Sequence, residues 1–152
     1  MSALELTSSL DYAAHTTLLV TMRLDHQLFG IPVEYVRDVL KDQKIARIPR
    51  APEDIAGSIN LRGRIVTVLN LRKRLGITSE YGVRPMFVVV EYKGEPFGIM
   101  VDNVSEVLKL PETDIEKAPP NLVPNWREVS SGVCRLKKDL LVVVDVRALL
   151  AV

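Results

Sequence analysis

The chain has 152 residues, 47% of them hydrophobic, and its 20 basic and 19 acidic residues leave a formal net charge of +1. This length fits one globular unit or two very small fused ones, and the balanced charge argues against a general polyanion binder. A single cysteine excludes an internal disulfide, and the apolar runs are far shorter than the roughly 18 residues of a membrane span, so we expect a cytoplasmic protein. Residues 1–15 carry Glu5 and Asp11 but no basic leader, which favours a flexible tail over a secretory signal.

The segments that follow the tail are expected to be mostly strands. They are short, rich in Val, Ile, Leu and Thr, and bounded by Gly, Pro or polar residues. The predicted strands are Thr17–Leu24, Gln27–Ile31, Ile45–Ile48, Ser58–Leu61 and Arg64–Leu71. Arg62 and Gly63 stand between the last two like the centre of a tight hairpin. Val33, Val36 and Leu40 are spaced for one face of a short helix, although a strand beyond Val36 remains possible.

The second half of the chain repeats the first. Residues 97–108 (FGIMVDNVSEVL) match residues 29–40 (FGIPVEYVRDVL) at seven of twelve positions, where ordinary composition would give roughly one. Farther on, residues 132–147 match residues 57–72, with seven extra residues between the matched blocks of the second copy. Four prolines in that stretch predict a loop; they are Pro111, Pro119, Pro120 and Pro124. Two unrelated β segments of similar composition are the alternative explanation.

The repeat predicts the architecture. About five short strands per copy indicate a small barrel or sandwich, and each copy closes with one turn of helix, at Leu71–Leu75 and Arg147–Leu150. A unit of fewer than 80 residues is marginal alone, so the copies should share a core. We therefore expect a mainly β protein: one domain over residues 16–152, built from two five-stranded barrels (about 16–80 and 81–152) around a pseudo-two-fold axis, with a few short helices. Which strand closes which barrel stays open, because tandem copies can exchange strands.

Motifs that would support catalysis or metal binding are missing from the sequence. It contains no Gly-x-Ser-x-Gly elbow, no phosphate-binding GK[ST] motif and no dinucleotide-binding GxGxxG. His15 and His26 have no nearby cysteine, which argues against a metal site. Cys134 aligns with Ile59 in the repeat, so we expect a buried small hydrophobic residue rather than a nucleophile. The sequence predicts a non-enzymatic protein without cofactor or metal.

Two features could instead serve binding. Arg62 has no arginine counterpart in the second copy; it is either a solvated turn residue or a guanidinium that grips a carboxylate or a partner surface. Val36, Val39, Val104 and Val107 occupy equivalent places in the two copies. They are either core residues or, facing each other across the pseudo-two-fold axis, the lining of an apolar groove for an amphipathic helix.

A basic cluster in the first copy allows a different function. Its members are Arg62, Arg64, Arg72, Lys73 and Arg74. Small β-barrels do bind RNA, so a small-barrel RNA-binding protein is the alternative hypothesis. Against it, only 5% of the residues are aromatic and none alternates with the basic residues, so stacking platforms for bases are scarce.

The segment GSINLRGRIVTVLNLRKRLGI resembles the signature of the CheW family, the adaptors of bacterial chemotaxis. FGIPVEYVRDVL, Arg47-Ile48-Pro49, FGIMVDNVSEVL and LLVVVDVRALL fall where that family has comparable segments, so the match spans about residues 17–150. The resemblance implies two SH3-like barrels in a non-catalytic adaptor. Such an adaptor links the cytoplasmic tips of methyl-accepting receptors to the regulatory domain of the histidine kinase CheA, at membrane-associated receptor arrays, without direct membrane insertion or a nucleic-acid partner.

The resemblance also implies two contact surfaces. The implied receptor-binding residues are Val36, Asp38, Val39, Arg62, Met86, Val104 and Val107. The implied kinase-binding residues are Lys44, Ile45, Arg47 and Gly57. In the family an acidic residue at position 38 pairs with the arginine at position 62; here it is Asp38 instead of the usual Glu, which leaves that bond open. Thr67 and Asn70 replace a common proline and aspartate. A scaffold in a non-chemotactic array, using the same fold with another receptor class, stays open as well.

Overall fold

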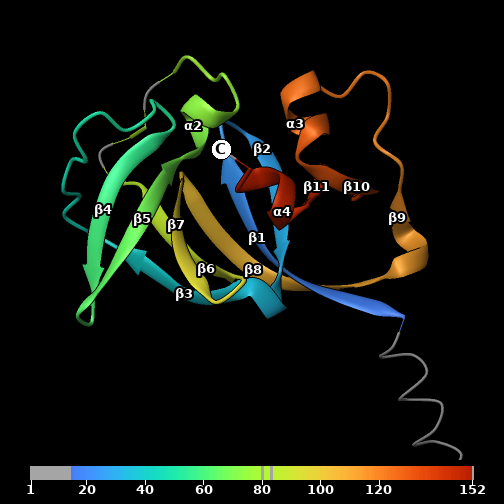
Figure 1. The fold of residues 1–152 in the computed structure, drawn as a ribbon. Helices are drawn as coiled ribbons and strands as arrows, with labels where there is room; N and C mark the ends of the chain where they lie inside the picture. The colour runs from blue at the N-terminus through green and yellow to red at the C-terminus, as the bar shows by residue number, and fades with distance from the viewer. Residues whose placement is uncertain (1–14, 80, 83, 152) are drawn as a thin grey trace, which may run out of the picture.

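The computed structural model describes residues 15–79, 81, 82 and 84–151, so all but the last residue of the predicted tail lies outside the described residues. Two mixed β-sheets dominate it (Figure 1). The six-stranded sheet has the order β8 (Asn103–Pro111), β1 (Thr16–Leu24), β2 (Gln27–Pro32), β11 (Leu140–Val144), β10 (Ser130–Arg135), β9 (Ile115–Glu116). The five-stranded sheet has the order β3 (Val36–Lys41), β6 (Met86–Tyr92), β7 (Glu95–Val101), β5 (Arg64–Asn70), β4 (Ile55–Leu61). The short helices are η1 (Val33–Tyr35), α2 (Leu71–Arg74), η2 (Glu112–Asp114), α3 (Pro124–Glu128) and α4 (Val146–Leu149).

The two copies of the repeat exchange hairpins. The β1–β2 hairpin of the first copy lies in the six-stranded sheet with β8 to β11, and the β6–β7 hairpin of the second copy lies in the five-stranded sheet with β3 to β5. Replacing every strand by its counterpart in the other copy converts the order β3-β6-β7-β5-β4 into β8-β1-β2-β11-β10. Among the strands of the described residues, only the two-residue strand β9 lacks a counterpart. The mainly β fold class is therefore confirmed, and each sheet takes strands from both halves of the chain.

The core has three parts, which explains how such small units are stable together. The largest hydrophobic cluster joins both sheets, with Met22 and Phe29 of one meeting Val88 and Ile99 of the other. A smaller cluster lies within each sheet's own module, around Leu19 in one and Ile59 and Val68 in the other. The expectation of a shared core is confirmed.

Two sequence predictions of local structure are wrong. Ile45–Ile48 is not a strand: it makes only one isolated bridge, Ala46 to Ser58. The helix predicted from Val33, Val36 and Leu40 is a single 3-10 turn, and the chain then continues as β3, the alternative left open beyond Val36. Every second residue of β3 is shielded, and pairing with β6 outweighs the weak helical spacing.

The proline-rich stretch of the second copy is more than a loop. It contains η2, β9 and, from Pro124, helix α3. Proline suits the first turn of a helix because its missing N–H would have no partner there. Trp126 of α3 is buried against Phe29, with ring centroids 5.1 Å apart.

Both closing helices form as the sequence predicts. The side chain of Asn70 accepts a hydrogen bond from the backbone N–H of Lys73 at 3.2 Å and so caps α2. In the second copy Asp145 does the same for α4. Asparagine and aspartate are comparable N-caps, so the Asn70 departure preserves the turn.

Candidate functional site

Arg62 and Asp38, far apart in sequence, form an ion pair on the five-stranded sheet. Arg62 and Gly63 have φ of 51° and 86°, as a two-residue hairpin between β4 and β5 requires. Asn60 steadies the turn by accepting a hydrogen bond from the Gly63 N–H at 2.9 Å. The Arg62 Nη2 lies 3.0 Å from Asp38 Oδ2, yet 76% of the Arg62 side chain is exposed. The shorter aspartate therefore reaches the arginine, which stays available to a partner.

A hollow of about 320 Å³ opens beside this ion pair. Its walls come from β3, β6 and the β4–β5 hairpin; they include Asp38, Arg62, Val66 and Val89. An apolar floor with a charged rim suits a protein surface better than a small metabolite.

The other predicted receptor residues lie on or beside edge strands. Val36 and Val39 belong to β3, which ends the five-stranded sheet, and Met86 pairs with Lys41 of that strand. Val104 and Val107 belong to β8, which ends the six-stranded sheet. Val39 is 38% exposed and Val107 is 54% exposed, whereas Val36 and Val104 are partly buried against the shared core. The structure thus joins Val36, Asp38, Val39, Met86 and Arg62 on one sheet, and places the second valine pair on the other sheet.

The predicted kinase residues come together at the start of β4. Ala46 and Ser58 exchange two backbone hydrogen bonds of 2.8 Å, which lays residues 44–47 against Gly57. Gly57 has φ +147°, and a Cβ there would lie 2.3 Å from the Ala46 carbonyl oxygen. Gly132, its repeat counterpart, is crowded in the same way by Ile115 and Glu116. The repeated glycine is thus explained by a crossing segment that leaves no room for a side chain.

One strand connects the two candidate surfaces. Gly57 lies near the start of β4, and Arg62 follows its end at Leu61. Five residues of strand span about 17 Å. Arg62 of the predicted receptor set and Gly57 of the predicted kinase set therefore lie at opposite ends of β4.

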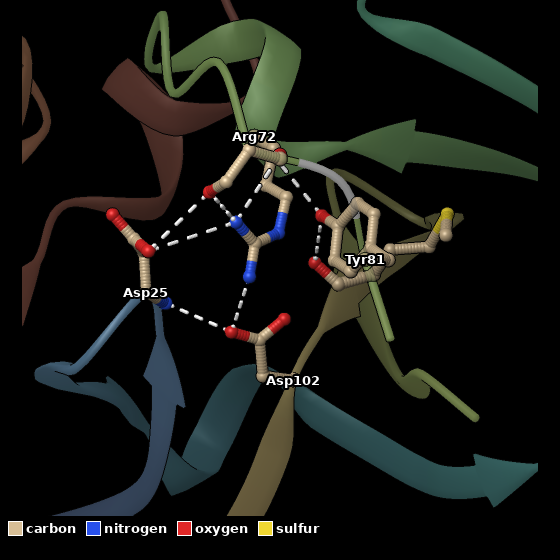
Figure 2. Close-up of polar contacts among 6 residues, drawn as sticks. Asp25, Arg72, Tyr81 and Asp102 are labelled. Carbon is tan, nitrogen blue, oxygen red and sulfur yellow. Dashed lines mark hydrogen bonds and ion pairs between the residues drawn. The ribbon is translucent and has the colours of Figure 1, made fainter. Parts of the chain in front are cut away.

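A buried arginine, not singled out as such by the sequence, joins the two sheets (Figure 2). Arg72 of α2 has a side chain only 8% exposed, and its Nη2 lies 2.6 Å from Asp102 Oδ2, between β7 and β8. Its Nη1 lies 3.8 Å from Oδ1 of Asp25, in the β1–β2 turn, and its guanidinium stacks 4.9 Å from the ring centroid of Tyr81. The Tyr81 hydroxyl accepts from the Arg72 N–H and donates to the Met100 carbonyl.

The charge of Arg72 is secured by its partners. Burial by itself lowers the pKa of Arg72, but the hydrogen bond to Asp102 and the nearby negative charges raise it overall. Burial also raises the pKa of the Tyr81 hydroxyl, which keeps it a neutral donor. This cluster is a fixed electrostatic link between the sheets rather than a reactive centre. The recurrence of Arg72 as Arg147 is the sequence signal that could have drawn attention to it.

The basic cluster proposed for RNA binding is not one surface. Arg72 is buried in its ion pair, and Arg74 donates to the Ala148 carbonyl at 3.1 Å. Arg62 pairs with Asp38. Of the remaining two cations, Arg64 lines the hollow beside Arg62 and Lys73 does not, so the five residues do not form the single basic groove that would follow a nucleic-acid backbone.

Cys134 is buried as expected, and burial, with Asp114 and Glu116 nearby, raises the pKa of its thiol. Since the thiolate is the reactive form, we expect the native protein to resist iodoacetamide at pH 8 over a time in which the urea-unfolded chain reacts fully. Mass spectrometry of both samples measures this. Rapid native labelling would contradict the buried placement.

No group of three or more His, Cys, Asp and Glu side chains suited to a metal ion occurs among the described residues.

Comparison with known proteins places the fold. A family model described as CheW-like domain matches residues 18–152. The chain belongs to the CheW family. The crystal structure of the scaffolding protein TtCheW from Thermoanaerobacter tengcongensis superimposes with a TM-score of 0.81 at 32% identity, covering 90% of this chain and 93% of that one.

Curated relatives agree. The chemotaxis protein CheW of Treponema pallidum is 31% identical over 136 residues, which cover 86% of this chain and 80% of the relative. That of Bacillus subtilis is 28% identical over 134 residues, 87% and 85% of the two chains. The resemblance drawn from the sequence is thus confirmed: this is a non-enzymatic chemotaxis scaffold of the CheW family. None of the helices in the described part of the chain has the length and apolar character to span a bilayer.

Proposed function

We propose that this scaffold couples methyl-accepting chemoreceptors to the histidine kinase CheA in the cytoplasm, recruited to membrane-associated receptor arrays. The cytoplasmic receptor tip binds Val36, Asp38, Val39, Arg62, Met86, Val104 and Val107. The regulatory domain of the kinase binds Lys44, Ile45, Arg47 and the segment around Gly57. The observation that carries the proposal is the exposed Arg62 guanidinium, held by Asp38 beside a partly apolar hollow.

The receptor surface combines apolar area with one fixed charge. Val39 and Val107 expose side chains on edge strands, where burial by a partner contributes about 25 cal/mol for each Å² of apolar surface. Arg62 is oriented before binding by its hairpin and by Asp38. Such a group fixes the register of a docked helix more than it adds affinity.

Coupling then follows from the rigid connection of the two surfaces. Because β4 joins them within one hydrogen-bonded sheet, the receptor and the kinase are held in a defined relation. A change in the receptor tip alters kinase activity to the extent that the assembled scaffold favours one kinase conformation over another.

The direct test is a pull-down of a receptor signalling fragment and of the kinase regulatory domain by the intact chain. Binding of both supports the proposal. If neither binds at micromolar concentration, the coupling function is refuted. Binding of RNA instead, with affinity that falls steeply with salt, would support the alternative hypothesis.

Arg62→Ala should weaken binding of the receptor fragment roughly 5- to 30-fold, as expected for an anchoring arginine that costs about 1–2 kcal/mol when truncated. Stability should change by less than about 1 kcal/mol, because the lost ion pair is exposed. Isothermal titration and urea unfolding measure the two effects.

Val36→Met should also weaken receptor binding, because a larger side chain at this partly buried edge alters the contact surface.

Arg135→Ala is the matched control. Arg135, on β10 of the other sheet, is also largely exposed and forms an ion pair with Glu116 at 3.1 Å. We expect its removal to leave receptor binding unchanged. Normal receptor-dependent kinase activation by both the Arg62 and Val36 variants would refute the assignment of this surface.

A further inference from the structure

A basic hollow of about 360 Å³ lies between the loop before β4 and helix α2. Its lining includes Arg47, Ile48, Arg50, Pro52, Glu53 and Lys73. Of these residues only Arg47 belongs to the predicted kinase-binding set. The hollow therefore extends beyond the contact surface that the sequence predicts.

The charges of the basic hollow are not balanced within the protein. Arg47, Arg50 and Lys73 face one carboxylate, Glu53, although the chain as a whole carries a net charge of only +1. None of the three cations makes an ion pair or a side-chain hydrogen bond with another described residue. Five arginines elsewhere in the described chain do pair with carboxylates: Arg23, Arg37, Arg62, Arg72 and Arg135. The hollow thus offers positive charge that an external anion can neutralise.

Backbone hydrogen bonds hold the loop in place. The Ala51 N–H donates to the Ile48 carbonyl and the Ile55 N–H to the Pro52 carbonyl, at 3.3 and 3.0 Å. The Asn70 N–H donates to the Asp54 carbonyl at 2.7 Å, which ties the loop to the start of α2. The cations are therefore presented by a fixed backbone, and a partner need not order the loop on binding.

The second copy shows the alternative arrangement. There Arg127 of α3 donates to the carbonyls of Pro119, Pro120 and Leu122. The cation of that copy is thus used within the protein to hold its own proline-rich loop. In the first copy, whose loop carries no such helix, the three cations remain open to solvent.

The lining favours a protein segment over nucleic acid. It contains no aromatic side chain on which a base could stack, and Glu53 would repel a phosphate backbone. Ile48, which follows Arg47 and precedes Pro49 in the sequence, also lines the hollow, and 37% of it is exposed. Carboxylates next to an aliphatic side chain match this mixture, since arginine binds carboxylates through paired hydrogen bonds.

We propose that the basic hollow binds an acidic segment of the kinase regulatory domain, so that Arg50 and Lys73 extend the kinase contact beyond Arg47. This inference rests on the proposed function, because it takes the kinase as the partner at this end of β4. The contact is then partly electrostatic, and the affinity for the kinase falls as ionic strength rises.

The test compares two double charge reversals of equal size in the full chain. Arg50→Glu/Lys73→Glu alters the hollow, and Lys137→Glu/Lys138→Glu alters an exposed turn of the six-stranded sheet. Isothermal titration with the kinase regulatory domain is carried out at about 50, 150 and 500 mM salt. We expect the hollow variant to lose roughly ten-fold or more in affinity at low salt, and most of the salt dependence. The turn variant should bind the kinase as the unaltered chain does. Both variants should keep their affinity for the receptor fragment.

A milder variant guards against misfolding. Arg50→Gln/Lys73→Gln removes the charges without adding new ones and should give an intermediate loss, with a melting temperature close to that of the unaltered chain. The inference is overturned if the hollow variant binds the kinase as the unaltered chain does, or if both reversals weaken binding equally. It is also overturned if the hollow variant loses binding of a single-stranded oligonucleotide and keeps that of the kinase. If the unaltered chain does not bind the kinase at any salt, the proposed function itself fails.

Discussion

Arg72→Ala is expected to lower the free energy of unfolding by about 3 kcal/mol, the largest loss that we foresee for an ionic side chain in this protein. The substitution removes a buried guanidinium and leaves Asp102 without its cation at 2.6 Å. It also removes the cation stacked on Tyr81. We expect a loss near the lower end of the range for breaking a buried ion pair, because 29% of the Asp102 side chain is exposed and can bind water. Urea unfolding followed by circular dichroism measures it.

The repeat provides the control. Arg147 is the counterpart of Arg72 in the second copy, but it is exposed and makes no ion pair with a described residue. Arg147→Ala should change stability by about 0.5 kcal/mol or less. The double variant Arg72→Met/Asp102→Asn should recover much of the loss, because no uncompensated charge remains in it. Equal effects at positions 72 and 147 would show that the cluster contributes little.

Gly57→Ala should lower the free energy of unfolding by about 2–4 kcal/mol, the second large effect that we expect. A Cβ would lie 2.3 Å from the Ala46 carbonyl oxygen and 2.6 Å from Cγ2 of Ile45, so the crossing segment must move away from β4. Its two hydrogen bonds to Ser58 should then break. Faster amide exchange at Ala46 and Ser58 would report this, and kinase binding should weaken with it.

Gly63→Ala separates crowding from backbone strain. Gly63 also has a positive φ, +86°, but a Cβ there meets nothing within 4 Å. Its replacement should cost only about 1 kcal/mol for the left-handed conformation. A Gly57 variant as stable as the Gly63 variant would mean that residues 44–47 are not held where the structure places them.

The sequence predicts most of this fold because the repeat identifies the positions that both copies need. Gly57 and Gly132 recur, and both lie under a crossing backbone. The hairpin at Arg62 and Gly63 follows from turn chemistry alone. The exchange of hairpins could not be predicted, because a strand has the same sequence pattern whichever copy it pairs with. Ile45–Ile48 shows the converse: strand-like residues form only a single bridge, Ala46 to Ser58.

The candidate surfaces are predictable only in part. The pair of Asp38 and Arg62 requires β3 and the β4–β5 hairpin to meet, which the family resemblance implied and the geometry shows at 3.0 Å. From the sequence Arg72 is only a member of the basic cluster. Its burial could not be predicted, because its partners come from distant turns: Asp25 precedes β2 and Asp102 precedes β8. Burial of a charge depends on such non-local neighbours, and local spacing does not report them.

The traded hairpins carry a consequence for the origin of the molecule. In a polypeptide with only one copy, the β1–β2 hairpin and the strands β3, β4 and β5 would belong to different sheets. Such a chain would complete both sheets by exchanging hairpins with a second molecule of itself. Such an ancestor is a domain-swapped homodimer. Fusion of two tandem genes would join the pair in one chain, after which the two formerly identical faces would be free to diverge toward separate partners.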